Sequence, residues 1–268
     1  MTAAILALLA GLIIGSFLNV CIYRWPRDLS VVRPRSHCPS CEKTIAWHDN
    51  IPLVSYLMLG AKCRYCGARI PLRYPVVELG TGLLFFAFVW IYGADLAALK
   101  MCVFGAILVG LIFADVEERI LPDELTIGGT VVGLVLSIFV QVPPSLAGLF
   151  PLITHVEFSP RSLSLMEAVM GAALPPSFLW LAGWVYEKVR HREGLGLGDV
   201  KLIAMVGSFL GFGGALYTLV LGSIAGSVIG YGYIKITGQD PATYELPFGT
   251  FLGAAALLIA LTARQVLG

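Results

Sequence analysis

Long apolar runs recur along the whole 268-residue chain, from Ile5 to its last residues. Several of them approach the ~20 residues that an α-helix needs to cross the hydrocarbon core of a bilayer. We therefore expect an all-α polytopic membrane protein with about eight transmembrane helices. The predicted spans are residues 3–22, 75–92, 95–115, 122–141, 165–187, 199–212, 214–236 and 247–267.

The composition excludes several other classes of protein. Hydrophobic residues make up 57% of the chain and charged residues 13%, whereas an ordinary soluble domain carries about 25% charged residues. A soluble enzyme is therefore excluded. An outer-membrane barrel would alternate polar and apolar residues in segments of roughly ten, and the apolar content of this chain is too high for that pattern. The formal net charge of +1 gives no basic surface for nucleic acid, so the expected surroundings are membrane lipid. The first run has no basic segment before it and no cleavage site after it, and we expect it to remain as a membrane helix.

One large polar insertion, residues 23–74, separates the first two predicted spans and holds nine of the 18 Lys and Arg residues. Basic residues are enriched on the cytoplasmic side of membrane proteins, which predicts a cytoplasmic insertion and an N-terminus outside. Alternating the remaining spans then places 15 basic residues inside and three outside. We expect three parts: a first helix (1–22), the insertion (23–74) and a membrane-embedded core (75–268). The loop at 142–164 falls on the outside and contains no motif that predicts a role.

Two CxxC pairs within the insertion predict a metal site. The four cysteines are Cys38, Cys41, Cys63 and Cys66. Two such pairs let four thiolates converge tetrahedrally on Zn²⁺, and a four-thiolate site has no open position, so the metal would be structural. The alternative is four unligated thiols, although an insertion of this size has little core and needs a cross-link. His37 and His48 lie nearby, either as substitute ligands or as surface residues.

Three aspartates fall at predicted helix ends on the cytoplasmic side: Asp115, Asp123 and Asp199. An aspartate at the middle of a membrane costs about 3 kcal/mol on insertion scales, and such residues are commonly functional. Asp115 and Asp199 could face each other across a helix bundle and share one proton. That arrangement is the chemistry of an aspartic protease, in which one carboxylate activates water and the other protonates the peptide carbonyl.

Each of these acids also has a structural interpretation. An aspartate at a helix end is often a cap or an interfacial charge, and for Asp123 this interpretation weighs as much as a catalytic one. Lys201, two residues after Asp199, could hold that carboxylate electrostatically or anchor the helix at the headgroups. The glycines before Asp199 allow a broken helix and a close approach of a substrate strand.

Taken together, the motifs resemble those of the bacterial type IV prepilin peptidases, also called leader peptidase/N-methyltransferases, a family of GxGD-type aspartic proteases. The resemblance covers nearly the whole chain. The matching segments besides the cysteine pairs are Gly15–Arg24, Asn50–Leu53, Arg73–Glu78, Asp115, Leu121–Asp123, Gly196–Lys201 and Pro247–Gly249.

The resemblance implies that Asp115 and Asp199 are the catalytic pair. It further implies a bacterial inner-membrane enzyme that cuts the leader from type IV prepilins or type II secretion pseudopilins after a glycine, on the cytoplasmic side. The new N-terminal amine would then be methylated with S-adenosylmethionine, a step associated with the cysteine-containing form. Glu78 is a candidate to receive the amine or the methyl donor, with an interfacial anchor as its alternative. Gly15, Ser16 and Asn19 are expected to serve close helix packing.

Two other functions are compatible with the same residues. One is a broader GxGD intramembrane protease that cuts signal-peptide remnants, and it would not require glycine before the scissile bond. The other is an ion transporter that uses the acids for proton or metal-ion movement and the cysteine-rich insertion as a sensor. A transporter would be expected to show repeated halves, and the sequence has no such repeat.

Overall fold

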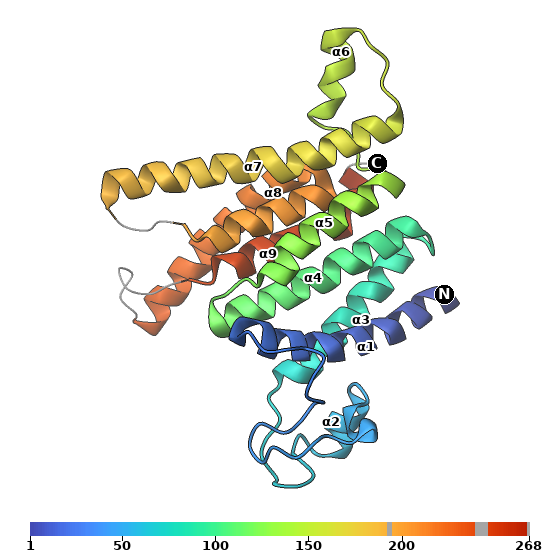
Figure 1. Cartoon of the computed structure of the whole chain (residues 1–268), viewed down its shortest axis with the longest axis vertical. Coiled ribbons are helices and arrows are strands. Elements are labelled where there is room, and N and C mark those ends of the chain that lie inside the picture. Colours follow the sequence, from blue (N-terminus) through green and yellow to red (C-terminus); the bar gives the residue numbers. More distant parts are fainter. Residues whose placement is uncertain (192–194, 239–245, 267–268) are drawn as a thin grey trace. The chain divides into compact units, whose positions relative to one another are not determined.

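The computed structural model describes residues 1–191, 195–238 and 246–266, with side chains up to residue 262 (Figure 1). The regular secondary structure in these ranges is helical, which confirms the predicted fold class. The chain forms two compact units, Met1–Phe113 and Ala114–Gly268. The predicted division at residues 22 and 74 is a different one and stays a prediction.

Close packing of two helices defines the first unit: α1 (Thr2–Arg24) lies along α3 (Arg73–Tyr92). A Cβ atom on Gly15 would lie 2.7 Å from Glu78 Cα, so only glycine fits there. Asn19 Nδ2 also donates to the Tyr74 carbonyl over 3.1 Å. The close approach of the two helix backbones at Gly15 and the interhelical hydrogen bond from Asn19 agree with the expected packing role of this helix face.

The polar insertion lies between α1 and α3 and contains little regular structure. Its elements are the 3-10 helices η1 (Trp25–Arg27) and η2 (Trp47–Asn50) and the short helix α2 (Val54–Met58). The buried Arg24 guanidinium donates to the carbonyls of Ser30 and Pro34 over 2.7 and 2.8 Å. These bonds turn the chain back beneath the end of α1. The unit is completed by α4 (Leu96–Glu118), whose last turn belongs to the second unit.

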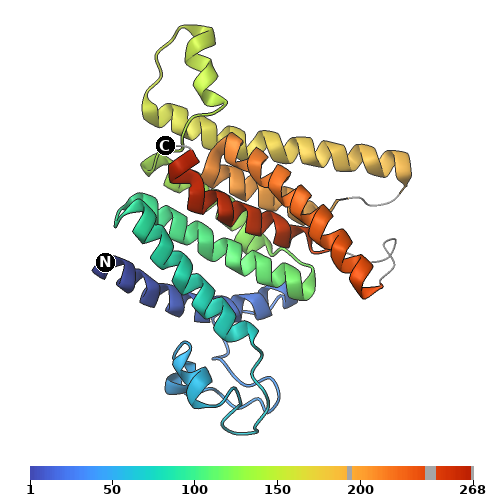
Figure 2. The ribbon, with the colours of Figure 1, turned by 180° about the vertical axis from the view of Figure 1, so that it is seen from behind.

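The second unit is a helical bundle. After α4 come α5 (Asp123–Phe139), η3 (Ala147–Leu149), α6 (Phe150–Thr154), α7 (Pro160–Arg190), α8 (Leu197–Thr237) and α9 (Phe248–Val266). Helix α8 packs against α5, α7 and α9. It is broken at Gly211, where φ is 76°, and Figures 1 and 2 draw its two halves side by side. This break lies within two residues of position 213, which separates the predicted spans 199–212 and 214–236.

A buried carboxylate explains where α8 breaks. Glu167 of α7 is 0% exposed, and its Oε1 accepts from the Phe212 N–H over 2.9 Å. Its Oε2 accepts from the N–H groups of Ser145 and Ala147 over 3.0 and 2.8 Å. A Cβ at Gly211 would lie 2.8 Å from Glu167 Cγ. The acid therefore caps the second half of α8 and ties the 142–164 loop to the bundle.

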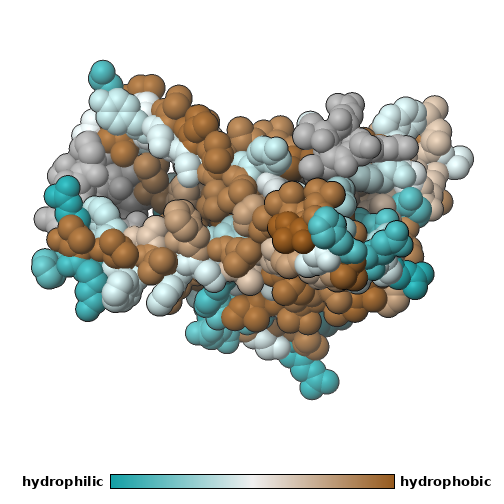
Figure 3. Space-filling view, turned by 90° about the horizontal axis from the view of Figure 1, so that it is seen from above, coloured by the Kyte–Doolittle hydropathy of each residue, from teal (hydrophilic) through white to brown (hydrophobic). Residues whose placement is uncertain are grey.

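Five of the described helices are long and apolar enough to cross a membrane: α1, α3, α4, α7 and α8. Helix α5 has 17 residues, and the apolar part of α9 is Phe248–Thr262, so both are shorter. Because α8 is broken, each of the eight predicted segments coincides with a helix or half-helix, whereas the number of crossings stays a prediction. Figure 3 shows broad apolar areas on the face it draws, as a membrane-embedded protein requires.

Candidate active site and metal centre

Asp115 lies on the last turn of α4 within the second unit, and its side chain is buried, at 6% exposure. Its Oδ2 accepts from the backbone N–H of Thr250 over 2.7 Å and from the Thr250 hydroxyl over 2.8 Å. Thr250 is in the first turn of α9, where backbone N–H groups have no partner within the helix. The helix terminus therefore fixes the position of one carboxylate oxygen and favours its negative charge.

Asp199 lies in the first turn of α8, which begins after Gly196, and its side chain is half-buried. The Asp115 carboxylate is near enough for its charge to act on the Asp199 carboxylate. The structure thus brings together two acids that are 84 positions apart in the sequence (199 − 115). Both stand at helix ends of the same unit.

Leu121 explains how the three chain segments around the acids fit together. A Cβ atom on Gly198 would lie 3.2 Å from Leu121 Cδ1, and one on Gly249 would lie 3.0 Å from the same atom. The leucine side chain therefore occupies the space above both glycines, beside Asp115 and Asp199. We did not predict roles for Leu121, Gly249 or Thr250. The motif segments Leu121–Asp123 and Pro247–Gly249, which contain or adjoin these residues, were the features of the sequence that could have indicated them.

Asp123 and Lys201 form an ion pair with each other. Lys201 Nζ lies 2.7 Å from Asp123 Oδ1, and the side chains are 37% and 57% exposed. The lysine thus joins the start of α5 to the first turn of α8, and among the described residues its ion pair is with Asp123, not with Asp199. In this arrangement both residues support the elements that carry the site.

The four predicted metal ligands in the first unit converge: the sulfur atoms of Cys38, Cys41, Cys63 and Cys66 all lie within 4.8 Å of one another. Tetrahedral coordination at Zn–S distances of ~2.3 Å places sulfur atoms about 3.8 Å apart. The Cys38 and Cys66 sulfurs are 3.8 Å apart. Backbone hydrogen bonds from Cys66 and Tyr65 lower the pKa of the Cys63 thiol to about 7, which favours the thiolate that a metal requires. The donor set fits Zn²⁺.

The two cysteine pairs are built on the same local fold, repeated 25 positions apart. In the first, the Cys38 N–H donates to the Lys43 carbonyl over 3.0 Å; in the second, the Cys63 N–H donates to the Ala68 carbonyl over 2.8 Å. The residue after each pair, Glu42 and Gly67, has a positive φ, at 57° and 70°. The insertion therefore contains two knuckles, one for each predicted CxxC pair, and both have the same backbone hydrogen-bond pattern.

Glu78 belongs to the first unit and is buried against α1. Its Oε2 accepts from the Leu53 N–H over 2.8 Å, and the Ser16 side chain is a second hydrogen-bond partner. Leu53 has a positive φ of 59°, so the carboxylate holds a strained turn of the insertion. Glu78 therefore connects the insertion to α1 and α3.

Comparisons with known proteins also divide the chain into an N-terminal and a C-terminal part. Residues 9–92 match the bacterial peptidase A24 N-terminal domain, and residues 102–231 match the type IV leader peptidase family. A Myxococcus xanthus protein named prepilin leader peptidase/N-methyltransferase is 40% identical over 88% of this chain, which spans 64% of that protein. A protein of the same name from Pseudomonas putida is 31% identical over 97% of this chain and 91% of its own length. An Escherichia coli protein named type 4 prepilin-like proteins leader peptide-processing enzyme is 34% identical over 94% and 91%. No solved structure matches the chain.

Proposed function

This chain belongs to the type IV leader peptidase family, and from that premise we propose that it is a prepilin peptidase with N-methyltransferase activity. Its substrates are type IV prepilins or type II secretion pseudopilins, which it cuts after a glycine. It is a multi-pass protein of the bacterial inner membrane, with its N-terminus outside and with the insertion and the two acids at the cytoplasmic face.

The packing around Leu121 is the observation that supports the peptidase assignment. Its side chain contacts Gly198, the residue before Asp199, and also Gly249, where a Cβ atom would lie 3.2 Å from Asp115 Oδ2. Two interacting carboxylates do not both ionise easily, so they share one proton. The ionised acid takes a proton from a water molecule held between the pair while the protonated acid donates to the scissile carbonyl oxygen. The tetrahedral intermediate then collapses, the amine leaves with a proton, and the roles of the two acids are exchanged. The Thr250 donors keep the Asp115 carboxylate in place throughout.

The methyl-transfer step uses S-adenosylmethionine as the methyl donor. When bound, this donor would supply an electrophilic methyl group, which would pass from its sulfonium sulfur to the neutral N-terminal amine. The products are the methylated N-terminus and S-adenosylhomocysteine, and the amine releases one proton to water. Cys38, Cys41, Cys63 and Cys66 would hold a structural Zn²⁺, which would keep the insertion folded.

Conservative removal of each carboxylate tests the peptidase. Purified Asp115→Asn and Asp199→Asn proteins should each lose at least about a thousandfold of prepilin cleavage, since they belong to one catalytic unit. Asp123→Asn is the matched control at the same membrane face, and it should only impair cleavage because it removes an exposed ion pair. Robust cutting by Asp199→Asn would overturn the assignment. Equal cutting of a prepilin without glycine before the scissile bond would instead favour a broader protease.

A further inference from the structure

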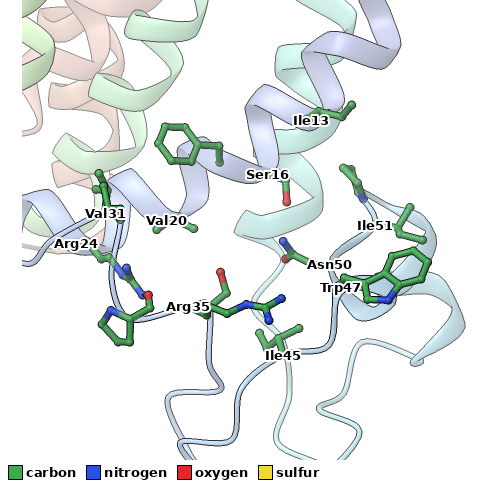
Figure 4. Close-up of a pocket in the computed structure, with 15 residues that line it drawn as sticks. Ile13, Ser16, Val20, Arg24, Val31, Arg35, Ile45, Trp47, Asn50 and Ile51 are labelled. Atoms are coloured by element: carbon green, nitrogen blue, oxygen red, sulfur yellow. The ribbon is translucent and has the colours of Figure 1, made fainter.

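A pocket of about 650 Å³ lies within the first unit, between α1 and the insertion (Figure 4). This volume is within the range of roughly 300–1,000 Å³ that is typical of small-molecule sites. One wall comes from α1 through Ile13, Ser16 and Val20, and others come from Arg35 and Trp47 of the insertion. Neither the proposed peptide cleavage nor the zinc cluster uses these side chains.

The pocket offers one cationic group that is available to a ligand. Arg24 and Arg35 both line it, but the Arg24 guanidinium already donates to the carbonyls of Ser30 and Pro34. Within the described ranges, the exposed Arg35 side chain makes no ion pair. Figure 4 shows this guanidinium reaching into the pocket from the extended chain below α1. A single carboxylate is therefore the anion that the pocket suits best.

The remaining lining suits a flat heterocycle and a few polar groups. The Trp47 side chain is 74% exposed and presents an indole ring for stacking. Ser16 points from α1 toward Asn50 across the pocket (Figure 4), so that a hydroxyl and an amide face each other. Ser16 is also a hydrogen-bond partner of Glu78. The Glu78 carboxyl group therefore lies directly behind this wall, where a negative charge would attract a positively charged part of a ligand.

The wall that carries Trp47 and Asn50 is held rigidly. Between these two residues, Asp49 accepts two hydrogen bonds from the Arg64 guanidinium, at 2.7 and 2.6 Å. These bonds hold the pKa of the Asp49 carboxyl below its usual range, so the pair is ionised at neutral pH. Arg64 lies inside the second cysteine pair. The cysteine cluster thus sets the position of the pocket wall, and a pre-ordered wall lowers the entropic penalty of ligand binding.

We propose that this pocket is the S-adenosylmethionine site, an inference that rests on the proposed N-methyltransferase function. The adenine ring stacks on Trp47, and the carboxylate of the methionine part pairs with Arg35. Ser16 and Asn50 form hydrogen bonds with the polar groups of the ligand that lie between its adenine ring and its carboxylate. Glu78 lies behind Ser16 and favours the positively charged sulfonium. The apolar residues of α1 exclude water from that wall.

Direct binding tests this assignment on the full-length protein in detergent or nanodiscs. We expect Trp47→Ala and Arg35→Ala each to raise the Kd for radiolabelled S-adenosylmethionine at least about tenfold. Trp90→Ala and Arg69→Ala are matched controls, because both side chains are exposed and lie outside the pocket. These controls should bind as the wild type does. Trp47→Phe keeps an aromatic ring and should recover most of the affinity.

A second measurement does not depend on any variant. Ultraviolet cross-linking of labelled S-adenosylmethionine to the wild-type protein should mark the peptide that contains Trp47. Retained affinity in both pocket variants, or a cross-link confined to another segment, would overturn the site. Cleavage and methylation of a prepilin are measured on the same samples, so a wild type that does both while the two pocket variants retain its affinity for the methyl donor overturns this inference alone. A wild type that neither cleaves nor methylates overturns the proposed function.

Discussion

The two sites of this molecule are assembled in opposite ways. Each cysteine knuckle forms within about eight consecutive residues, and its backbone hydrogen bonds are local. The aspartate pair instead requires the ends of three helices, with Leu121 packed over Gly198 and Gly249 and with Thr250 bonded to Asp115. Each knuckle is a local motif, whereas the acid pair exists only when the helical bundle is complete. The cysteine cluster should therefore be sensitive to the loss of a metal-ligating thiol, and the aspartate pair to changes in helix packing.

Loss of the metal should produce the largest difference between the two sites. Cys38→Ser, or a strong chelator, should remove the roughly one Zn²⁺ per chain that elemental analysis of the reduced wild type is expected to find. Limited proteolysis should then cut residues 25–72 quickly while the helices of the second unit stay protected, because the insertion has little core of its own.

Cys102→Ser is the matched control for this experiment, because Cys102 lies in α4 outside the cluster. It should keep the metal and the protection of the insertion. Freshly purified, reduced wild-type protein without metal would contradict the assignment of the four thiols.

A smaller effect is expected when one donor to the acid pair is removed. Thr250→Val keeps the backbone N–H but deletes the hydroxyl that donates to Asp115 Oδ2. One charge-assisted hydrogen bond is worth about 1.5–3 kcal/mol, so we expect kcat for prepilin cleavage to fall roughly 10- to 100-fold with little change in KM. Thr250→Ser should restore most of the rate.

The control for this substitution is Thr262→Val, since that hydroxyl donates to the Leu258 and Ile259 carbonyls of its own helix. Its cleavage rate should stay near that of the wild type. An unchanged rate in Thr250→Val would show that the hydroxyl does not position the acid.

The smallest effect should come from the exposed ion pair. Lys201→Met leaves Asp123 without its partner, and exposed ion pairs contribute about 0–1 kcal/mol. Thermal unfolding and cleavage should therefore change little, with the rate within about fivefold of wild type. Complete loss of cleavage in Lys201→Met, with Asp123→Asn still active, would mean that the lysine acts on Asp199 instead.

The features that could be predicted from the sequence are those encoded by short spacing. The CxxC pairs determine the sulfur cluster because two thiols on one knuckle face the same point. The predicted boundary between the spans 199–212 and 214–236 also lies close to the break that the structure has at Gly211. The predicted spans and the charge distribution allowed Asp115 and Asp199 to face each other at one predicted membrane face, and the resemblance implied that they are the catalytic pair.

Long-range contacts explain what could not be predicted. Glu167 bonds to Ala147 and Phe212 across two loops, and an acid in an apolar helix gives no indication of such partners. Thr250 was one of several threonines until the fold placed it beside Asp115.

The cooperation of the two acids is the central claim, and a double-variant comparison tests it most directly. Single-turnover prepilin cleavage is measured for Asp115→Asn, Asp199→Asn and the protein that carries both changes. If the carboxylates act as one unit on one water molecule, each single change should lower the rate about as far as the double change does. Losses that multiply from partial single effects, or a single variant that cleaves near the wild-type rate, would contradict the claim.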